Sequence, residues 1–308
     1  MLKYFIKRLL GILVTTLLVS IFVFVLVRLM PGDPVRQMVD DDATLETINA
    51  VRAEYGLDKP IVEQFIDWIT GMLKGDFGKS YRTRQPIGEE IGKRYLKTLK
   101  LAVIAVVWST AVGLLLGVWT GVHSGKWQDY LGVTAAVTGQ AVPTFWIGLL
   151  LIFLFGVKLQ VLPVSGAEGW KSLVLPSFTL GLSMAAAVTR FTRSAVLECL
   201  KEDYVRTARA KGLKERIIIW RHVLRNSLIS VITVVGLQFG AMLGGAVMIE
   251  TVFSYPGIGS YLVTSIGLRD YPVVQALVII LALNFVVVNF IVDLLYALVN
   301  PEIRLERG

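Results

Sequence analysis

Reactive and metal-binding residues are scarce in this chain of 308 residues, which contains one cysteine and two histidines. A single cysteine, Cys199, excludes an intrachain disulfide and a metal site built from several cysteines. The histidines, His123 and His222, lie far apart in the sequence, so a structural zinc site is not expected. The chain also lacks the HExxH and GxSxG patterns of two large enzyme classes. These absences predict a protein that is not an enzyme and holds no metal or other cofactor of its own.

Charge is also scarce, because 18% of the residues are charged while 55% are hydrophobic and the mean hydropathy is +0.65. A soluble domain with a polar surface would be less apolar, so we predict an integral membrane protein in contact with lipid. The net charge of +8 could suggest nucleic acid as a partner. However, the basic residues concentrate in the first eight positions and in the loop that begins at Arg190, which membrane orientation explains better.

Six apolar runs are long enough to cross a bilayer: Leu9–Leu29, Thr98–Val122, Tyr130–Leu159, Ser172–Phe191, Leu228–Ile249 and Val273–Val299. They predict an all-α polytopic membrane protein with six transmembrane helices. The basic N-terminus and the basic loop 190–225 must lie on the cytoplasmic side, which predicts that both termini are cytoplasmic.

The runs divide the chain into four parts. Residues 1–30 form an N-terminal tail and first helix, residues 98–299 form a five-helix core with a cytoplasmic loop at 192–227, and residues 300–308 form a cytoplasmic tail. Between them, residues 31–97 are polar and form an extracytoplasmic insert. Apolar residues at helical spacing predict two helices in this insert, at Thr44–Tyr55 and Ile61–Leu73.

The insert contains Gly78-Lys79-Ser80, which resembles part of a phosphate-binding loop. A true loop of that kind needs a glycine five positions before Gly78, and position 73 is Leu. We therefore predict that this motif binds no nucleotide.

The segment 201–226 is polar and mostly basic, between two apolar runs. Acidic residues at its start and basic residues after them complement the dipole of a short helix. Gly212 stands where such a helix needs a left-handed residue beyond its end, and Leu213 follows it. We predict a surface helix that docks on a partner, and its contact residues are Glu202, Asp203, Tyr204, Arg206, Thr207, Ala208, Arg209, Gly212 and Leu213.

Two features of this helix suggest how it meets a partner. Ala208 and Ala210 are small enough for another backbone to come close, and Tyr204 and Val205 could fill a pocket on that partner. The alternative is a loop that is basic only because cytoplasmic loops of membrane proteins are basic.

The segment resembles the coupling loop of permease subunits of ATP-binding cassette importers. The general pattern of that loop is Glu-Ala-Ala, three residues, Gly, nine residues and Ile-x-Leu-Pro, and the corresponding residues here are Arg206-Thr207-Ala208, Gly212 and His222-Val223-Leu224-Arg225. The departures from the pattern are themselves similar to the dipeptide, oligopeptide, glutathione and nickel branch, as are PGDP at 31–34 and GDFGKSY at 75–81. The acidic position of the general pattern is occupied by Arg206, so which side chain meets the ATPase is open.

The resemblance implies a type I importer permease that forms the pathway with a second, related permease in the bacterial inner membrane. It also implies two ATPase subunits, which bind ATP and magnesium, and an external solute-binding protein. The solute would be a peptide, glutathione, nickel or a metal chelate. The alternative is a self-contained secondary transporter or channel, which would have no use for a docking helix.

Several polar or helix-breaking residues are candidates for the pathway or its gate. The third run contains Pro143, which predicts a kink that either serves packing or lines the pathway with Gln140. The stretch 250–259 predicts an ordered external loop, which borders the outer end of the pathway in the resembling family. The full set of candidates is Gln140, Pro143, Gln238, Glu250, Pro256, Gly257 and Asn284. Glu250, like Asp293 in the last run, either pairs structurally or serves transport.

Overall fold

A computed structural model describes residues 2–29, 33, 35–39 and 42–299, without the side chains of 2–5, 7, 37, 229, 230, 293 and 295–299. The predicted tail at 300–308 and the side chain of Asp293 therefore lie outside the described residues. Every regular element in the described ranges is a helix. In chain order they are α1 (Leu2–Leu29), the 3-10 helix Val35–Gln37, α2 (Leu45–Glu54), α3 (Ile61–Leu73), α4 (Ile87–Val122), α5 (Trp127–Ala141), α6 (Thr144–Leu151), the π-helix Ile152–Lys158, α7 (Lys171–Cys199), α8 (Asp203–Ala210), α9 (Glu215–Ile217), the π-helix Ile218–Val223, α10 (Leu224–Val252), α11 (Ile258–Gly267) and α12 (Tyr271–Val299).

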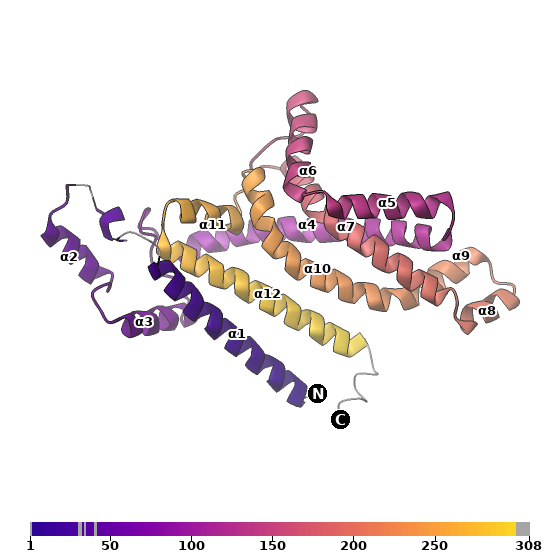
Figure 1. Ribbon diagram of the computed structural model, residues 1–308, viewed down its shortest axis with the longest axis horizontal. Coiled ribbons are helices and arrows are strands. Elements are labelled where there is room, and N and C mark those ends of the chain that lie inside the picture. Colours follow the sequence, from indigo (N-terminus) through magenta and orange to yellow (C-terminus); the bar gives the residue numbers. More distant parts are fainter. Residues whose placement is uncertain (1, 30–32, 34, 40–41, 300–308) are drawn as a thin grey trace. The chain divides into compact units, whose positions relative to one another are not determined.

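Five helices of the described chain are long and apolar enough to cross a membrane, and a bent pair makes a sixth span if it is counted as one. The five spans lie in α1, α4, α7, α10 and α12, and the bent pair is α5 with α6 and its π-helix (Figure 1). The predicted all-α polytopic fold is confirmed. The apolar runs were sufficient for this because each backbone polar group in a membrane must be satisfied within its own helix.

The third predicted span is bent much more sharply than a kink. Trp127–Ala141 and Thr144–Lys158 meet at 98°. Val142 is extended, with ψ 130°, and Pro143 occupies the N-cap of α6. Proline disfavours helical geometry in the residue before it and has no N–H to donate, so the α5 ladder ends and a new helix begins.

The chain forms two compact units, and each has its own core. The first comprises residues 1–98 and 256–286. One of its clusters joins the start of α4 to α11 and α12 through Ile87, Ile91, Ile258, Val273 and Leu277. The boundary predicted at residue 97 falls inside α4, which is continuous from Ile87 to Val122. Glu89 and Glu90 in its first turn favour this earlier start, because carboxylates stabilise a helix N-terminus.

The insert helices follow the predicted pattern. The hydroxyl oxygen of Thr44 caps α2 by accepting from the Thr47 amide at 3.3 Å, and α3 spans Ile61–Leu73 as predicted. A turn at Gly56, with φ 63°, separates the two helices. Both helices belong to the first unit and neither is long enough to be a span.

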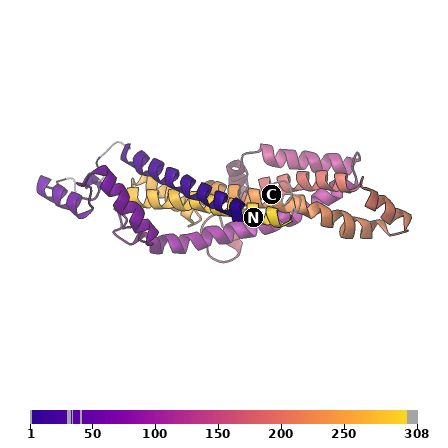
Figure 2. The same cartoon turned by 90° about the horizontal axis from the view of Figure 1, so that it is seen from below.

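The second unit comprises, of the described chain, residues 99–255 and 287–299 and is organised around α7. Helix α7 runs beside α5 and α10 in both views (Figure 1 and Figure 2). Its core includes Leu180, Met184 and Val188, which pack with Ile249 and Phe253 at the end of α10. Most of the α7 side chains are buried in the protein and not exposed to lipid.

Helices α4 and α7 approach each other closely along a row of glycines. A Cβ at Gly113 would lie 2.6 Å from the Cβ of Val188, and a Cβ at Gly121 would lie 2.8 Å from a methyl group of Val196. A Cβ at Gly117, which lies between them, would be 2.7 Å from the carbonyl oxygen of Thr189. Any larger residue at these positions would force the helices apart.

Candidate coupling segment and pathway residues

The predicted surface helix exists as α8, and its boundaries follow local chemistry. Glu202 is its N-cap residue in extended conformation, and Asp203 stands in the first turn. At the other end Gly212 has φ 74°. The Gly212 amide donates to the Arg209 carbonyl at 2.9 Å, and the Leu213 amide donates to the Ala208 carbonyl at 3.3 Å. These two bonds form a Schellman motif, so the prediction that Gly212 closes the helix in a left-handed conformation is confirmed.

An ion pair spans the turn that follows α8. The Arg209 Nε lies 2.7 Å from the Glu215 Oε1, and a second guanidinium nitrogen donates to Oε2 at 3.3 Å. The hydrogen bond from Arg209 to Glu215 raises the pKa of the guanidinium. Because both side chains are about half exposed, the pair adds less than about 1 kcal/mol to the stability of the turn.

The inner face of α8 packs on its own chain. Val205 is fully buried and Ala208 is 7% exposed, in a cluster with Val196, Ile218 and Val223. The expectation that Val205 fills a pocket on a partner is therefore wrong, and the close approach at Ala208 is made by this chain. The helical period places positions 205 and 208 on one face of α8. The sequence does not say whether this face packs on the same chain or on a partner.

The outer face of α8 is polar and open to solvent. Arg206 and Asp203 are 86% and 97% exposed in their side chains and lie 3.8 Å apart. Tyr204, Thr207 and Arg209 are also exposed. Beyond the turn, Gly212 and Leu213 are exposed as well. Of the nine residues assigned to docking, Ala208 alone is buried, so the others remain available to a partner.

An ion pair that we did not predict ties α7 to the start of α5. The Arg193 guanidinium binds both carboxylate oxygens of Asp129, at 2.5 and 2.7 Å, and the Gly125 amide donates to the same carboxylate at 3.0 Å. Asp129 is 4% exposed. A bidentate pair of this kind fixes orientation as well as distance. It holds α7 just before the turn into α8, and the partners are 64 residues apart, beyond the reach of a local pattern.

The Gly78-Lys79-Ser80 motif forms a turn in which the Gly78 amide and the Ser80 hydroxyl are already engaged. The Asp76 carboxylate accepts from the Gly78 amide at 2.9 Å. The Ser80 hydroxyl donates to the buried Asp270 carboxylate, which also accepts from the Tyr81 amide at 3.0 Å. This turn therefore ties the insert to the start of α12. That it binds no nucleotide stays a prediction.

The candidate pathway residues fall into both units. Gln140 and Pro143 are exposed at the break between α5 and α6, and Gln238 is half buried in α10. Pro256, Gly257 and Asn284 belong to the first unit, where the Asn284 amide oxygen accepts from the Tyr95 hydroxyl at 2.8 Å. Their assignment to one pathway remains a prediction.

Glu250 is fully buried near the end of α10. The predicted external loop at 250–259 is shorter than expected, because α10 continues to Val252 and α11 begins at Ile258. The Glu250 carbonyl accepts from the Tyr255 amide at 2.7 Å, with Ser254 left-handed at φ 46°. The hydrogen-bond pattern that ends α8 at Gly212 thus also ends α10, where Ser254 takes the left-handed position.

Two family profiles match the chain. Residues 113–305 match the profile described as the inner membrane component of binding-protein-dependent transport systems, and residues 1–102 match the profile for the N-terminal part of such components. The boundary between the two profiles lies within α4.

Curated relatives match over almost the full chain. The glutathione transport system permease protein GsiC of Salmonella typhimurium is 47% identical over 304 residues, which is 99% of both chains. The protein of the same name in Escherichia coli K12 is 45% identical over the same length.

Solved structures share the fold at much lower identity. The MetNI methionine ABC transporter in an inward-facing conformation aligns with a TM-score of 0.56 and 17% identity, over 68% of this chain and 96% of that one. An amino acid ABC transporter solved with histidines aligns with a TM-score of 0.54 and 14% identity, over 68% and 93% of the two chains.

Proposed function

Since this chain belongs to the family of inner membrane components of binding-protein-dependent transport systems, we propose that it is one of two permease subunits that together form the pathway of an ATP-driven importer. It is a multi-pass protein of the inner membrane, and its own part in transport is that of a permease. The observation that carries the proposal is the outer face of α8, a helix with a well-defined end whose outward side chains, Asp203 and Arg206 above all, are open to solvent.

The partners follow from this role. Two ATPase subunits bind ATP and magnesium and dock on the outer face of α8, a second permease completes the pathway, and an external binding protein delivers the solute. Closing and release of the ATPase pair then move α8 and open the pathway alternately to the two sides.

The solute that we propose is glutathione or a short peptide. Relatives at 45% and 47% identity over the full length are named glutathione permeases. Nickel would require hard or borderline ligands, and the described residues contain no group of three or more His, Cys, Asp or Glu side chains that could hold a metal ion.

The uptake experiment uses the complete importer reconstituted in vesicles with its binding protein. We expect uptake of labelled glutathione that requires both ATP inside and binding protein outside. Uptake that continues without ATP would instead identify a self-contained carrier.

For the orientation we propose cytoplasmic termini and an external insert. The basic N-terminal residues and the basic α8 segment support one cytoplasmic side. In a Cys199→Ser background, a cysteine at Glu63, which is exposed on α3, should react with an impermeant thiol reagent added to intact cells. A cysteine at Arg206 should react only after the membrane is opened. The reverse pattern would contradict the orientation.

A further inference from the structure

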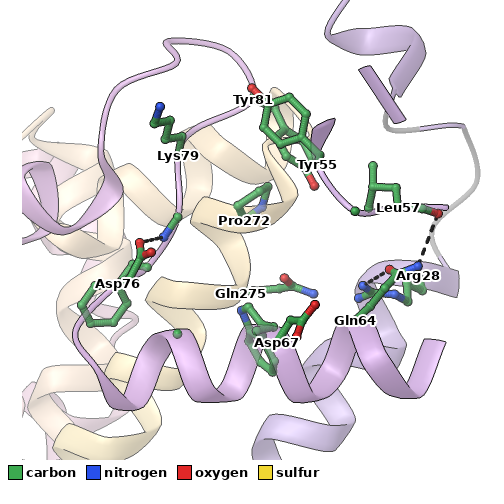
Figure 3. Close-up of a pocket in the computed structure, with 15 residues that line it drawn as sticks. Arg28, Tyr55, Leu57, Gln64, Asp67, Asp76, Lys79, Tyr81, Pro272 and Gln275 are labelled. Atoms are coloured by element: carbon green, nitrogen blue, oxygen red, sulfur yellow. Dashed lines mark hydrogen bonds between the residues drawn. The ribbon is translucent and has the colours of Figure 1, made fainter. Parts of the chain in front are cut away.

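The first unit contains a pocket of about 250 Å³ between the insert and the start of α12 (Figure 3). Small-molecule sites usually occupy about 300 to 1,000 Å³. This pocket lies just below that range, so only a small ligand such as a short peptide would fit it. Its walls come from the end of α1, from the turn at residues 55–57 after α2, from α3, from the turn at residues 76–81 and from α12. All of these belong to one compact unit.

Charged groups lie at both ends of the pocket. Arg28 and Gln64 stand at one end, and Asp76 and Lys79 stand at the other (Figure 3). Asp67 projects from α3 between them (Figure 3). A ligand that matches this order has a carboxylate at one end and an amino-acid head, with its own carboxylate and ammonium, at the other.

Arg28 is oriented but not neutralised. Its guanidinium lies 3.4 Å from the centre of the Phe24 ring and donates to the Gln64 Oε1 at 2.6 Å. Within the part of the chain that the structure describes, no carboxylate pairs with Arg28 or with Lys79. A fixed guanidinium with spare donors is suited to bind a carboxylate.

The Gln275 side chain supplies an independent observation. It is 7% exposed and projects into the pocket (Figure 3). Among the described residues, nothing forms a hydrogen bond with its amide. The amide therefore offers a donor and an acceptor side by side to the pocket, and this arrangement matches a peptide bond.

Aromatic rings close the pocket. Tyr55 and Tyr81 meet edge to face with centroids 5.3 Å apart, and Trp68 and Phe77 line the remaining wall. Burial raises the pKa of Tyr81 to about 12, so this ring stays neutral at physiological pH. The rings form the apolar wall of the pocket, while the charged side chains at its two ends are open to solvent.

We infer that this pocket is a binding site for the transported solute on the permease itself, and that it takes a short peptide with carboxylates at both ends, of which glutathione is an example. Arg28 binds one terminal carboxylate, Lys79 and Asp76 bind the amino-acid head, and Gln275 binds a peptide bond between them. The inference rests on the proposed function, because it takes the solute from there.

The test measures direct binding of radiolabelled glutathione to the purified permease and ATPase complex, without binding protein. Three variants, Arg28→Gln, Lys79→Gln and Gln275→Leu, should each weaken binding by about tenfold or more, as expected for one lost hydrogen bond to a charged or buried group. Lys74→Gln is the matched control, because Lys74 is exposed on the same insert outside the pocket, and it should bind as the unchanged complex does. Glutathione with both carboxylates esterified should not compete.

Lys79→Gln changes an exposed loop residue, so its folding is not at risk. Wild-type affinity in this variant and in Arg28→Gln would overturn the inference, as would full competition by the diester. Normal glutathione binding combined with weaker docking of the binding protein would also overturn it, because the pocket would then receive an acidic segment of that protein.

Uptake by the complete importer separates the two proposals. If the unchanged complex takes up glutathione but the variants bind it with unaltered affinity, the pocket assignment is overturned and the proposed function stands. Absence of both glutathione and peptide uptake by the unchanged complex would overturn the proposed function, and the inference with it.

Discussion

Two turns in this protein place a glycine in almost the same conformation and secure it by different means. Gly212 after α8 has φ 74° and Gly78 in the insert has φ 76°. At neither position would an added Cβ meet another atom within 4 Å. The Gly212 turn is held by backbone hydrogen bonds to residues at most five positions away. The Gly78 turn also has local bonds, such as that from the Ile87 amide to the Gly78 carbonyl at 3.0 Å, but its position is fixed through Ser80 by Asp270, which lies 190 residues further on.

The difference shows that the same local conformation can be encoded locally or borrowed from a distant element. The Gly212 turn should form whenever α8 forms, because its bonds belong to the helix end itself. The Gly78 turn should keep its place only while the start of α12 offers the Asp270 carboxylate. Four substitutions follow in order of decreasing effect, and the first three test this contrast.

Replacing Asp270 by Ala should have the largest effect. It leaves the Ser80 hydroxyl and the Tyr81 amide buried without an acceptor, at a cost of about 2 to 4 kcal/mol. The inactivation temperature of the complex in detergent should fall by several degrees, and the loop 76–86 should become sensitive to protease. Asp76→Ala is the control, since it removes one exposed bond to Gly78, and an equal loss of stability in both variants would refute the contrast.

Replacing Gly212 by Val should come next. The substitution forces a β-branched side chain into left-handed conformation, at about 1 to 2 kcal/mol, and misdirects the chain between α8 and α9. We expect solute-stimulated ATP hydrolysis and transport to fall while the membrane helices still insert. Gly78→Val carries the same strain and should retain the ATPases on co-purification. Normal transport in Gly212→Val would remove the coupling assignment.

Replacing Glu215 by Gln should have a small effect. It breaks the exposed pair with Arg209 but leaves the backbone bonds of the turn, so stability should change by less than about 1 kcal/mol. The difference should disappear at about 1 M salt, where such pairs are screened. A loss as large as that of Gly212→Val would mean that the ion pair, and not the backbone, closes the helix.

Replacing Lys79 by Ala should have no effect on nucleotide chemistry. Leu73 stands where a phosphate-binding loop needs glycine, and the Ser80 hydroxyl is engaged by Asp270. ATP hydrolysis measured without solute should equal that of the unchanged complex. Photolabelling of this subunit by an ATP analogue that depends on Lys79 would contradict the prediction.

The features that the sequence predicted well are those with a local cause. The apolar runs located the spans, and the glycine and charge pattern located α8 and its end. The apolar run starts at Thr98, so the sequence pattern placed the start of α4 there. The helix in fact begins at Ile87, because the more polar residues before Thr98 are helical as well.

The features that the sequence missed depend on pairing between distant residues. In the sequence, Asp129 and Arg193 are two unrelated charged residues near loops. Only the fold brings them together as an ion pair. The inward face of Val205 depends on α8 folding back onto the cluster around Ile218. Pro143 predicted that the third span is interrupted. The 98° angle between its two helices depends on how they pack and not on the proline alone.

The glycine row between α4 and α7 has a mechanical consequence. At Gly113, Gly117 and Gly121 the α4 backbone packs directly on the short, branched side chains of Val188, Thr192 and Val196, so no long flexible side chain lies between the two helices to absorb a displacement. Only residues 200–202 connect α7 to α8, and so short a connection leaves α8 little freedom to move independently of α7. In the proposed importer, a displacement of α8 would therefore pass to α7 and α4 together, because the two packed helices move as one piece.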